Sequence, residues 1–96
     1  MSPEKQKKLN ILRKHLDRLD DSFIKLIKKR SNLVNEVLKL KDYKNQIVDK
    51  KRIKIILNRI KRKSIENNID PKITNRIWKN MIWSYIDYEK RNFKKK

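Results

Sequence analysis

Apolar residues recur every three or four positions through most of the first 41 residues, which is the spacing of one face of an α-helix. The row on that face is Arg13, Leu16, Asp20, Phe23, Ile27, Arg30, Val34, Val37 and Lys41. Ser2, Pro3 and Glu4 supply a cap residue, a proline at the first helical position and an acid in the first turn. No glycine or further proline interrupts the pattern, so we predict one unbroken helix over about residues 3–41.

Two shorter amphipathic stretches follow the long one. The segment DYKNQIVD, residues 42–49, breaks the periodicity and is typical of a loop. A second helix is predicted over about residues 50–67, and its apolar side carries Ile53, Ile56, Leu57 and Ile60. Asp70 and Pro71 are a cap and a first-turn proline for a third helix over about residues 71–92. The residues that this helix is expected to bury are Ile73, Ile77, Met81, Ile82 and Ile86.

These elements predict an all-α fold of one long and two shorter helices in a single domain over residues 1–96. A helix over residues 3–41 would be roughly 57 Å long at about 1.5 Å per residue. The rest of so small a chain is too short to cover its apolar face. The sequence therefore favours a helical homodimer.

Several kinds of site are excluded by composition. The 96 residues contain no cysteine and no glycine, which rules out disulfides, thiolate metal sites and glycine-rich phosphate loops. A single histidine, His15, leaves no multi-histidine metal site. No apolar run of about 18 residues is present, and the start MSPEKQKKLN lacks the apolar core of a signal peptide. We therefore expect a cytoplasmic protein without a transmembrane helix.

The net charge of +18, from 29 Lys and Arg against 11 Asp and Glu, suggests an anionic partner. A basic helical protein that binds nucleic acid is one hypothesis, and Trp78, Trp83 and Tyr88 would offer surfaces for stacking on bases. Aromatic residues at helical spacing are more often core residues, however. The excess of lysine, isoleucine and asparagine is also typical of an A/T-rich coding sequence. The positions of individual bases are therefore more informative than the total.

Three bases lie on the apolar face of the long helix, where solvated charges are not expected. Arg30 and Lys41 are eleven residues apart (41 − 30) and project from the same side. Arg13 and Arg30 are seventeen apart (30 − 13), roughly 100° out of line, so Arg13 is better placed to reach a partner chain. The bases either snorkel to water and pair with acids such as Asp20, or line an internal pocket for a small, multiply charged anion.

These residues resemble the all-helical class of chorismate mutases, over roughly residues 9–93. The stretches that carry the resemblance are LRKHLDRLDDSFIKLIKKRSNLVNEVLKLK, VDKKR and DPKITNRIWKNMI, followed by YE. The resemblance implies an intertwined homodimer with two equivalent active sites, each completed by an arginine of the other chain. It also implies isomerisation of chorismate to prephenate in aromatic amino acid biosynthesis. That unimolecular rearrangement needs no nucleophile, metal or cofactor.

The resemblance assigns roles to individual residues by position. Arg30 and the partner's Arg13 would hold the carboxylates of the dianionic substrate. Lys41 would contact a carboxylate and the ether oxygen of the breaking bond. Arg52 would add to the cationic wall, and Asp49 would lie near the ring hydroxyl.

Glu89 falls where the family has a glutamine or glutamate facing the same ether oxygen. An ionised carboxylate there would repel that oxygen, so the role requires a protonated Glu89 that donates a hydrogen bond. Turnover is then expected to fall as the pH rises. Whether Glu89 carries the proton at working pH stays open.

Two positions depart from the usual mutase pattern. Ile53 stands where the family usually has a glutamate, and Tyr85 stands where it usually has serine or threonine. Both resemble the isochorismate pyruvate lyases of the same fold, which form salicylate and pyruvate. Isochorismate carries its hydroxyl elsewhere on the ring, so an acceptor at position 53 would have no partner. Simple drift is the other explanation, and the lyase reaction is the alternative function.

Overall fold

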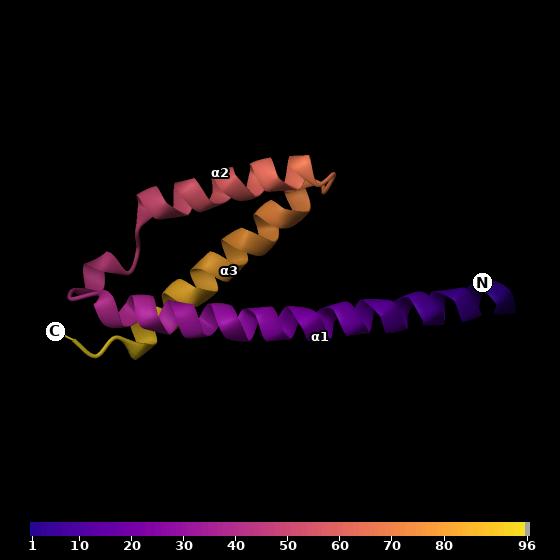
Figure 1. The fold of residues 1–96 in the computed structure, drawn as a ribbon, viewed down its shortest axis with the longest axis horizontal. Helices are drawn as coiled ribbons and strands as arrows, with labels where there is room; N and C mark the ends of the chain where they lie inside the picture. The colour runs from indigo at the N-terminus through magenta and orange to yellow at the C-terminus, as the bar shows by residue number, and fades with distance from the viewer. Residues whose placement is uncertain (96) are drawn as a thin grey trace. The chain divides into compact units, whose positions relative to one another are not determined.

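The computed structural model describes residues 1–95, and these form three α-helices without a β-strand. Helix α1 spans Pro3–Leu40, α2 spans Lys50–Glu66 and α3 spans Pro71–Asn92, and a short 3-10 helix, η1, spans Lys44–Gln46 (Figure 1). The prediction of an all-α chain with one long and two shorter helices is confirmed, and the helix ends differ from the expected ones by at most one residue. Within residues 1–95 no helix combines the length and apolar character needed to cross a membrane.

The helices begin where short polar side chains accept backbone hydrogen bonds. Ser2 Oγ accepts from the backbone N–H three residues later at 3.2 Å, ahead of α1. Asp49 Oδ1 does the same for α2 at 3.0 Å, and Asp70 Oδ1 accepts from the N–H two residues later at 2.9 Å, ahead of Pro71. Each bond satisfies one of the backbone donors that a helix leaves unpaired in its first turn.

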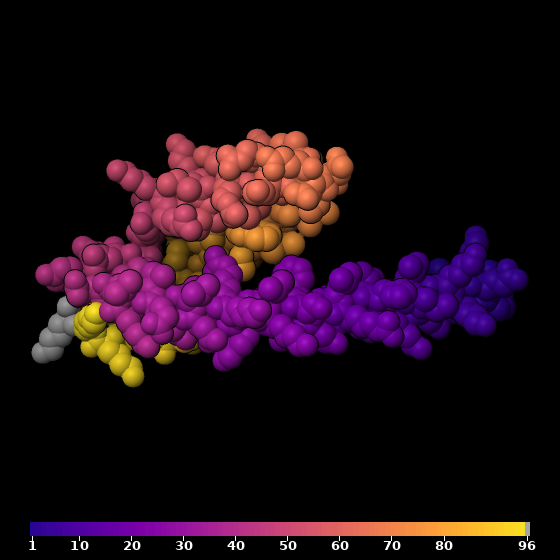
Figure 2. Space-filling view, viewed as in Figure 1, coloured from indigo at the N-terminus to yellow at the C-terminus, as the bar shows by residue number. Residues whose placement is uncertain are grey.

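The chain divides into two compact units, Met1–Val34 and Asn35–Lys96, and the expectation of a single domain stays a prediction. The first unit is the N-terminal part of α1, a helix in which no described residue is buried. Large apolar side chains such as Leu12, Leu16 and Phe23 are more than half exposed. Figure 2 shows the side chains of this indigo-to-purple segment projecting from the helix. This unit has an amphipathic pattern but no apolar core of its own.

The second unit contains a small apolar core. Its centre is a cluster of three buried isoleucines, Ile47, Ile82 and Ile86. Packed against the cluster are Leu38, Val48, Ile53, Ile56, Leu57 and Phe93. The core therefore joins the last turns of α1, the segment before α2, and the hairpin of α2 and α3 (Figure 1).

The segment between α1 and α2 is more ordered than the predicted loop. Ile47, which follows η1, is only 3% exposed and belongs to the core cluster. Gln46 Oε1 accepts hydrogen bonds from the backbone N–H groups of Asp42 at 2.7 Å and Tyr43 at 2.8 Å. These bonds give the segment an internal structure that presents Ile47 to the core.

The prediction that α3 buries Ile73 and Ile77 is wrong, since these side chains are 56% and 42% exposed. Ile82 and Ile86 are buried as expected. Thr74 bonds to α2 through its hydroxyl and so marks the side of α3 that faces α2. Ile73 lies about 100° around the helix from Thr74, and Ile77 is one turn further along on the same side.

A tight turn links α2 to α3. Asn68 adopts a left-handed backbone conformation with φ of 56°, which asparagine tolerates better than most residues. The N–H of Asn68 donates to the carbonyl of Ile65 at 3.2 Å, and the N–H of Ile69 donates to that of Ser64 at 2.8 Å, which is a Schellman motif. Ser64 is buried and its Oγ lies 2.6 Å from Oγ1 of the half-buried Thr74, so a hydroxyl pair fastens this end of the hairpin.

Candidate active site

A buried ion pair joins the end of α1 to the end of α3. Lys41 Nζ donates a hydrogen bond to Glu89 Oε1 at 3.1 Å. The two side chains are 17% and 7% exposed. Burial of a charged group is costly unless it is paired, and removal of one partner from such a pair typically costs about 3–5 kcal/mol. The fold therefore keeps an ionic contact where apolar side chains would otherwise pack.

The local sequence places both groups at the core. Glu89 lies three residues after Ile86 and seven after Ile82, so it shares the buried face of α3. Lys41 directly follows α1, and its backbone N–H donates to the carbonyl of Leu38, a residue packed against the core cluster, at 3.2 Å. Each charged residue thus continues a row of core positions.

The pair leaves hydrogen-bonding capacity for a ligand. An ammonium group has three N–H donors, and Glu89 accepts one of those of Lys41. A carboxyl group has two oxygens, and Lys41 contacts Oε1 of Glu89. An anion or ether oxygen near the pair can therefore be met by a further N–H of Lys41 without loss of the Lys41–Glu89 bond.

The first turn of α2 carries three more of the predicted site residues. Asp49 caps the helix through Oδ1, which accepts from the backbone N–H of Arg52. The side chains of Asp49 and Arg52 are exposed. Ile53 is half-buried and packs against the core cluster. The apolar residue at position 53 therefore has a structural role in this unit.

The remaining predicted site residues lie on α3 and α1. Tyr85 is half-buried and precedes Glu89 by one turn of α3. Arg13 and Arg30 belong to the first unit, where Arg13 is exposed and Arg30 is half-buried. The structure thus brings Lys41 and Glu89 into direct contact. The roles of Arg13 and Arg30 in the site remain predictions.

The direct Lys41–Glu89 bond was not predicted from the sequence, although both residues were expected to face one atom of a ligand. The signal available was that each charge continues a row of apolar core positions. Opposite charges on two buried faces have to be paired.

The chain is thus an all-α protein with a buried ionic site at the ends of two helices. The profile of the family described as chorismate mutase type II matches residues 12–90. This chain belongs to that family, as its sequence predicted.

A curated relative carries the same description. The chorismate mutase of Methanocaldococcus jannaschii is 34% identical to this chain over 76 residues, which cover 78% of this chain and 77% of the relative. No solved structure matches the chain. Neither the family nor the relative is described as an isochorismate pyruvate lyase.

Proposed function

We propose that this protein is a chorismate mutase, an isomerase that converts chorismate to prephenate. The observation that carries the proposal is the buried Lys41–Glu89 pair, found at the two positions where the family resemblance requires groups that face the ether oxygen. Membership of the type II family and the description of the archaeal relative support the same reaction.

In the proposed mechanism Lys41 stabilises the charge that develops during bond cleavage. The ether oxygen gains electron density as its bond to the ring breaks, and a further N–H of Lys41 donates to it. Donors aimed at a developing charge in a buried site typically contribute about 10²–10³-fold to the rate each. Glu89 holds the ammonium in place through Oε1.

The other proposed contacts select and hold the dianion. Arg30 and the partner's Arg13 bind its carboxylates, because guanidinium groups pair with carboxylates through two parallel hydrogen bonds. Arg52 adds positive charge at the start of α2. Asp49 and Tyr85 lie near the ring. The rearrangement is unimolecular, so the protein has only to hold the reactive conformer and stabilise charge.

We also propose that the active form is a homodimer. The exposed apolar face of the first unit supports this, since a contiguous apolar patch on a protein surface usually marks an interface. Two chains also allow Arg13 to complete the site of the partner. Turnover is therefore expected to depend on dimer formation.

The test supplies the purified protein with chorismate and isochorismate in separate assays. We expect prephenate from chorismate. Lys41→Ala should lose turnover by about 10²–10³-fold, whereas Lys44→Ala, which alters an exposed lysine of η1, should keep it. Salicylate and pyruvate from isochorismate, with no prephenate from chorismate, would establish the lyase reaction instead. Turnover of neither substrate, with salt-sensitive binding to duplex DNA, would favour the nucleic-acid hypothesis.

A further inference from the structure

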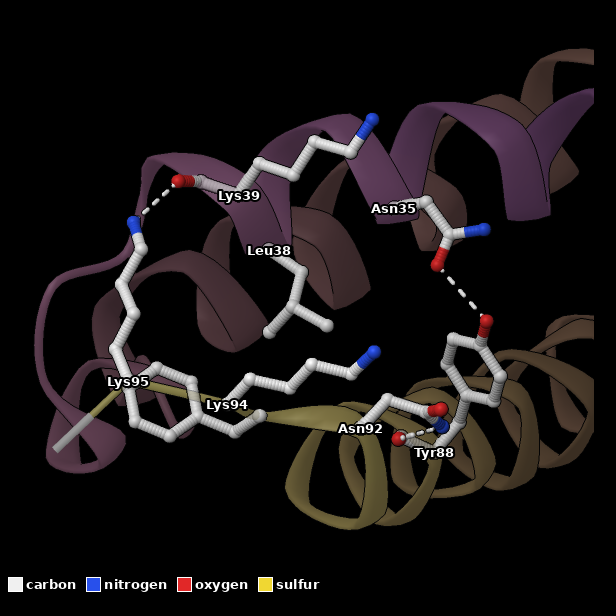
Figure 3. A pocket seen from close by; sticks show the side chains of 8 residues that line it. Asn35, Leu38, Lys39, Tyr88, Asn92, Lys94 and Lys95 are labelled. Atoms are coloured by element: carbon white, nitrogen blue, oxygen red, sulfur yellow. Dashed lines mark hydrogen bonds between the residues drawn. The ribbon is translucent and has the colours of Figure 1, made fainter.

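The second unit contains a cavity that the proposed reaction does not use. Its volume is about 380 Å³, within the range of small-molecule sites. Every lining residue belongs to the last turns of α1, the last turns of α3 or the segment that follows α3 (Figure 3). Neither Lys41 nor Glu89 lines it, and no lining residue comes from α2.

Among residues 1–95, the charged side chains that line this cavity are those of Lys39, Lys94 and Lys95, and no carboxylate of these described residues lines it. Lys39 Nζ lies 3.3 Å from Glu36, but both side chains are about 70% exposed (72% and 69%), and such surface pairs contribute little. Among residues 1–95, Lys94 makes neither an ion pair nor a side-chain hydrogen bond, and Figure 3 shows its side chain extended between the two helices.

Apolar and aromatic side chains form the rest of the wall. Leu38 and Phe93 pack against the core cluster and expose their other sides to the cavity. The ring of Tyr88 is held in place because its hydroxyl donates to Asn35 Oδ1 at 2.8 Å (Figure 3). The wall can therefore take an apolar ring, and the rim can take a negative charge.

Lys95 closes one end of the cavity. Its ammonium donates to the backbone carbonyl of Lys39 at 2.6 Å (Figure 3) and lies 3.8 Å from Asp42. The carbonyl of Lys39 is among the last four of α1, which have no partner within the helix. This contact fastens the segment after α3 to the end of α1. It also occupies Lys95. Lys39 is paired with Glu36, and Figure 3 shows its side chain directed away from Leu38 and Lys94, so among the lining lysines Lys94 remains to bind an anion.

We propose that this cavity is a second ligand site, specific for a small aromatic monocarboxylate. The ring packs against Leu38, Tyr88 and Phe93, and the carboxylate is bound by Lys94. One ammonium group suits a single carboxylate, and the small volume suits one ring. This site is separate from the Lys41–Glu89 pair, and the proposal does not depend on the reaction catalysed there.

Calorimetric titration with 3-phenylpropanoate tests the proposal. We expect one molecule bound per chain. The neutral amide of the same compound should bind at least about tenfold more weakly, because charge-assisted hydrogen bonds are lost. No binding of the carboxylate, or equal binding of the amide, would overturn the proposal.

A matched pair of variants locates the site. Lys94→Gln should weaken 3-phenylpropanoate binding at least about tenfold. Lys54→Gln removes the same charge from an exposed position of α2 and should leave binding unchanged. Equal weakening by both variants would mean that net charge alone attracts the probe, and would contradict the proposal.

Amide NMR shifts separate this cavity from the active site. On addition of 3-phenylpropanoate, the largest shifts should fall at Leu38, Tyr88 and Phe93. Shifts confined to Arg52 and Ile53 would place the probe beside the proposed substrate instead, and would overturn the second site. The lysine variants should keep wild-type turnover of chorismate, because neither lysine belongs to the proposed catalytic contacts.

Discussion

The two units of the chain treat their apolar side chains in opposite ways. The Asn35–Lys96 unit buries Ile47, Ile82 and Ile86 among the ends of its own helices. The Met1–Val34 unit repeats apolar residues at helical spacing and leaves side chains such as Leu16 exposed. The same amphipathic pattern can therefore form a core within the chain, or form an exposed face that packs against another chain in the proposed dimer.

The charged side chains differ between the units as well. In the second unit a lysine and a glutamate satisfy each other inside the core. In the first unit the proposed contributions are arginines, which suit the carboxylates of an external ligand.

The largest expected effect comes from Arg30→Ala, which tests whether the first unit binds substrate. We expect near-complete loss of chorismate turnover, about 10²–10³-fold or more, because a carboxylate would lose its paired cation. The dimer should remain intact by light scattering. Lys29→Ala, an exposed neighbour, is the control and should keep its activity. A wild-type rate in Arg30→Ala would contradict the proposed site.

The next effect tests the exposed apolar face. Leu16→Lys with Phe23→Lys should convert the dimer to monomers and reduce turnover, since each buried apolar side chain contributes about 1.5–3 kcal/mol. Asn10→Lys with Asn32→Lys adds the same charge on the opposite side of α1 and should leave the dimer intact. Sedimentation and turnover are measured together. A dimer that survives the first double variant would remove this face from the interface.

A smaller effect tests the role of Glu89 in the buried pair. Glu89→Ala leaves the Lys41 ammonium without its partner and should reduce turnover, because the ammonium is no longer held in place. Glu89→Gln keeps an oxygen that can accept from Lys41 and should retain more turnover than Glu89→Ala. The rates of both variants are measured beside the wild type. A wild-type rate in Glu89→Ala would remove Glu89 from the site.

The smallest effect concerns the stability of the second unit. Ser64→Ala removes a buried hydroxyl that bonds to Thr74 and to the carbonyl of Ile60, and should lower the free energy of unfolding by about 1–3 kcal/mol. Ser84→Ala is a close control, since Ser84 bonds in the same way to the carbonyl of Asn80 but is exposed. Urea titration should show a change within about 0.5 kcal/mol for this control. Equal losses would mean that burial of the hydroxyl pair is unimportant.

The helices were predictable because their limits depend on local chemistry. Ser2, Asp70 and Pro71 act within one turn of their own positions. Ile47 was missed because it lies outside any periodic stretch. Ile73 was assigned to the core because periodicity identifies an apolar face without showing whether the same chain covers it.

The candidate site was only partly predictable for a related reason. The bases of α1 stood out because a charge on an apolar face is unusual. The bond from Lys41 to Glu89 joins residues 48 positions apart, and such pairings depend on how the helices pack. The resemblance to the chorismate mutases identified Lys41 and Glu89 as site residues. The structure showed that the two side chains contact each other.

The two hydrogen bonds accepted by the Gln46 side chain have a consequence for how this chain can change in length. The amide oxygen of Gln46 accepts from the N–H groups of Asp42 and Tyr43, so the segment acts as a spacer of fixed length between Lys41 and the first turn of α2. A single inserted or deleted residue there would withdraw Ile47 from the core. Length variation should therefore be poorly tolerated between residues 42 and 47.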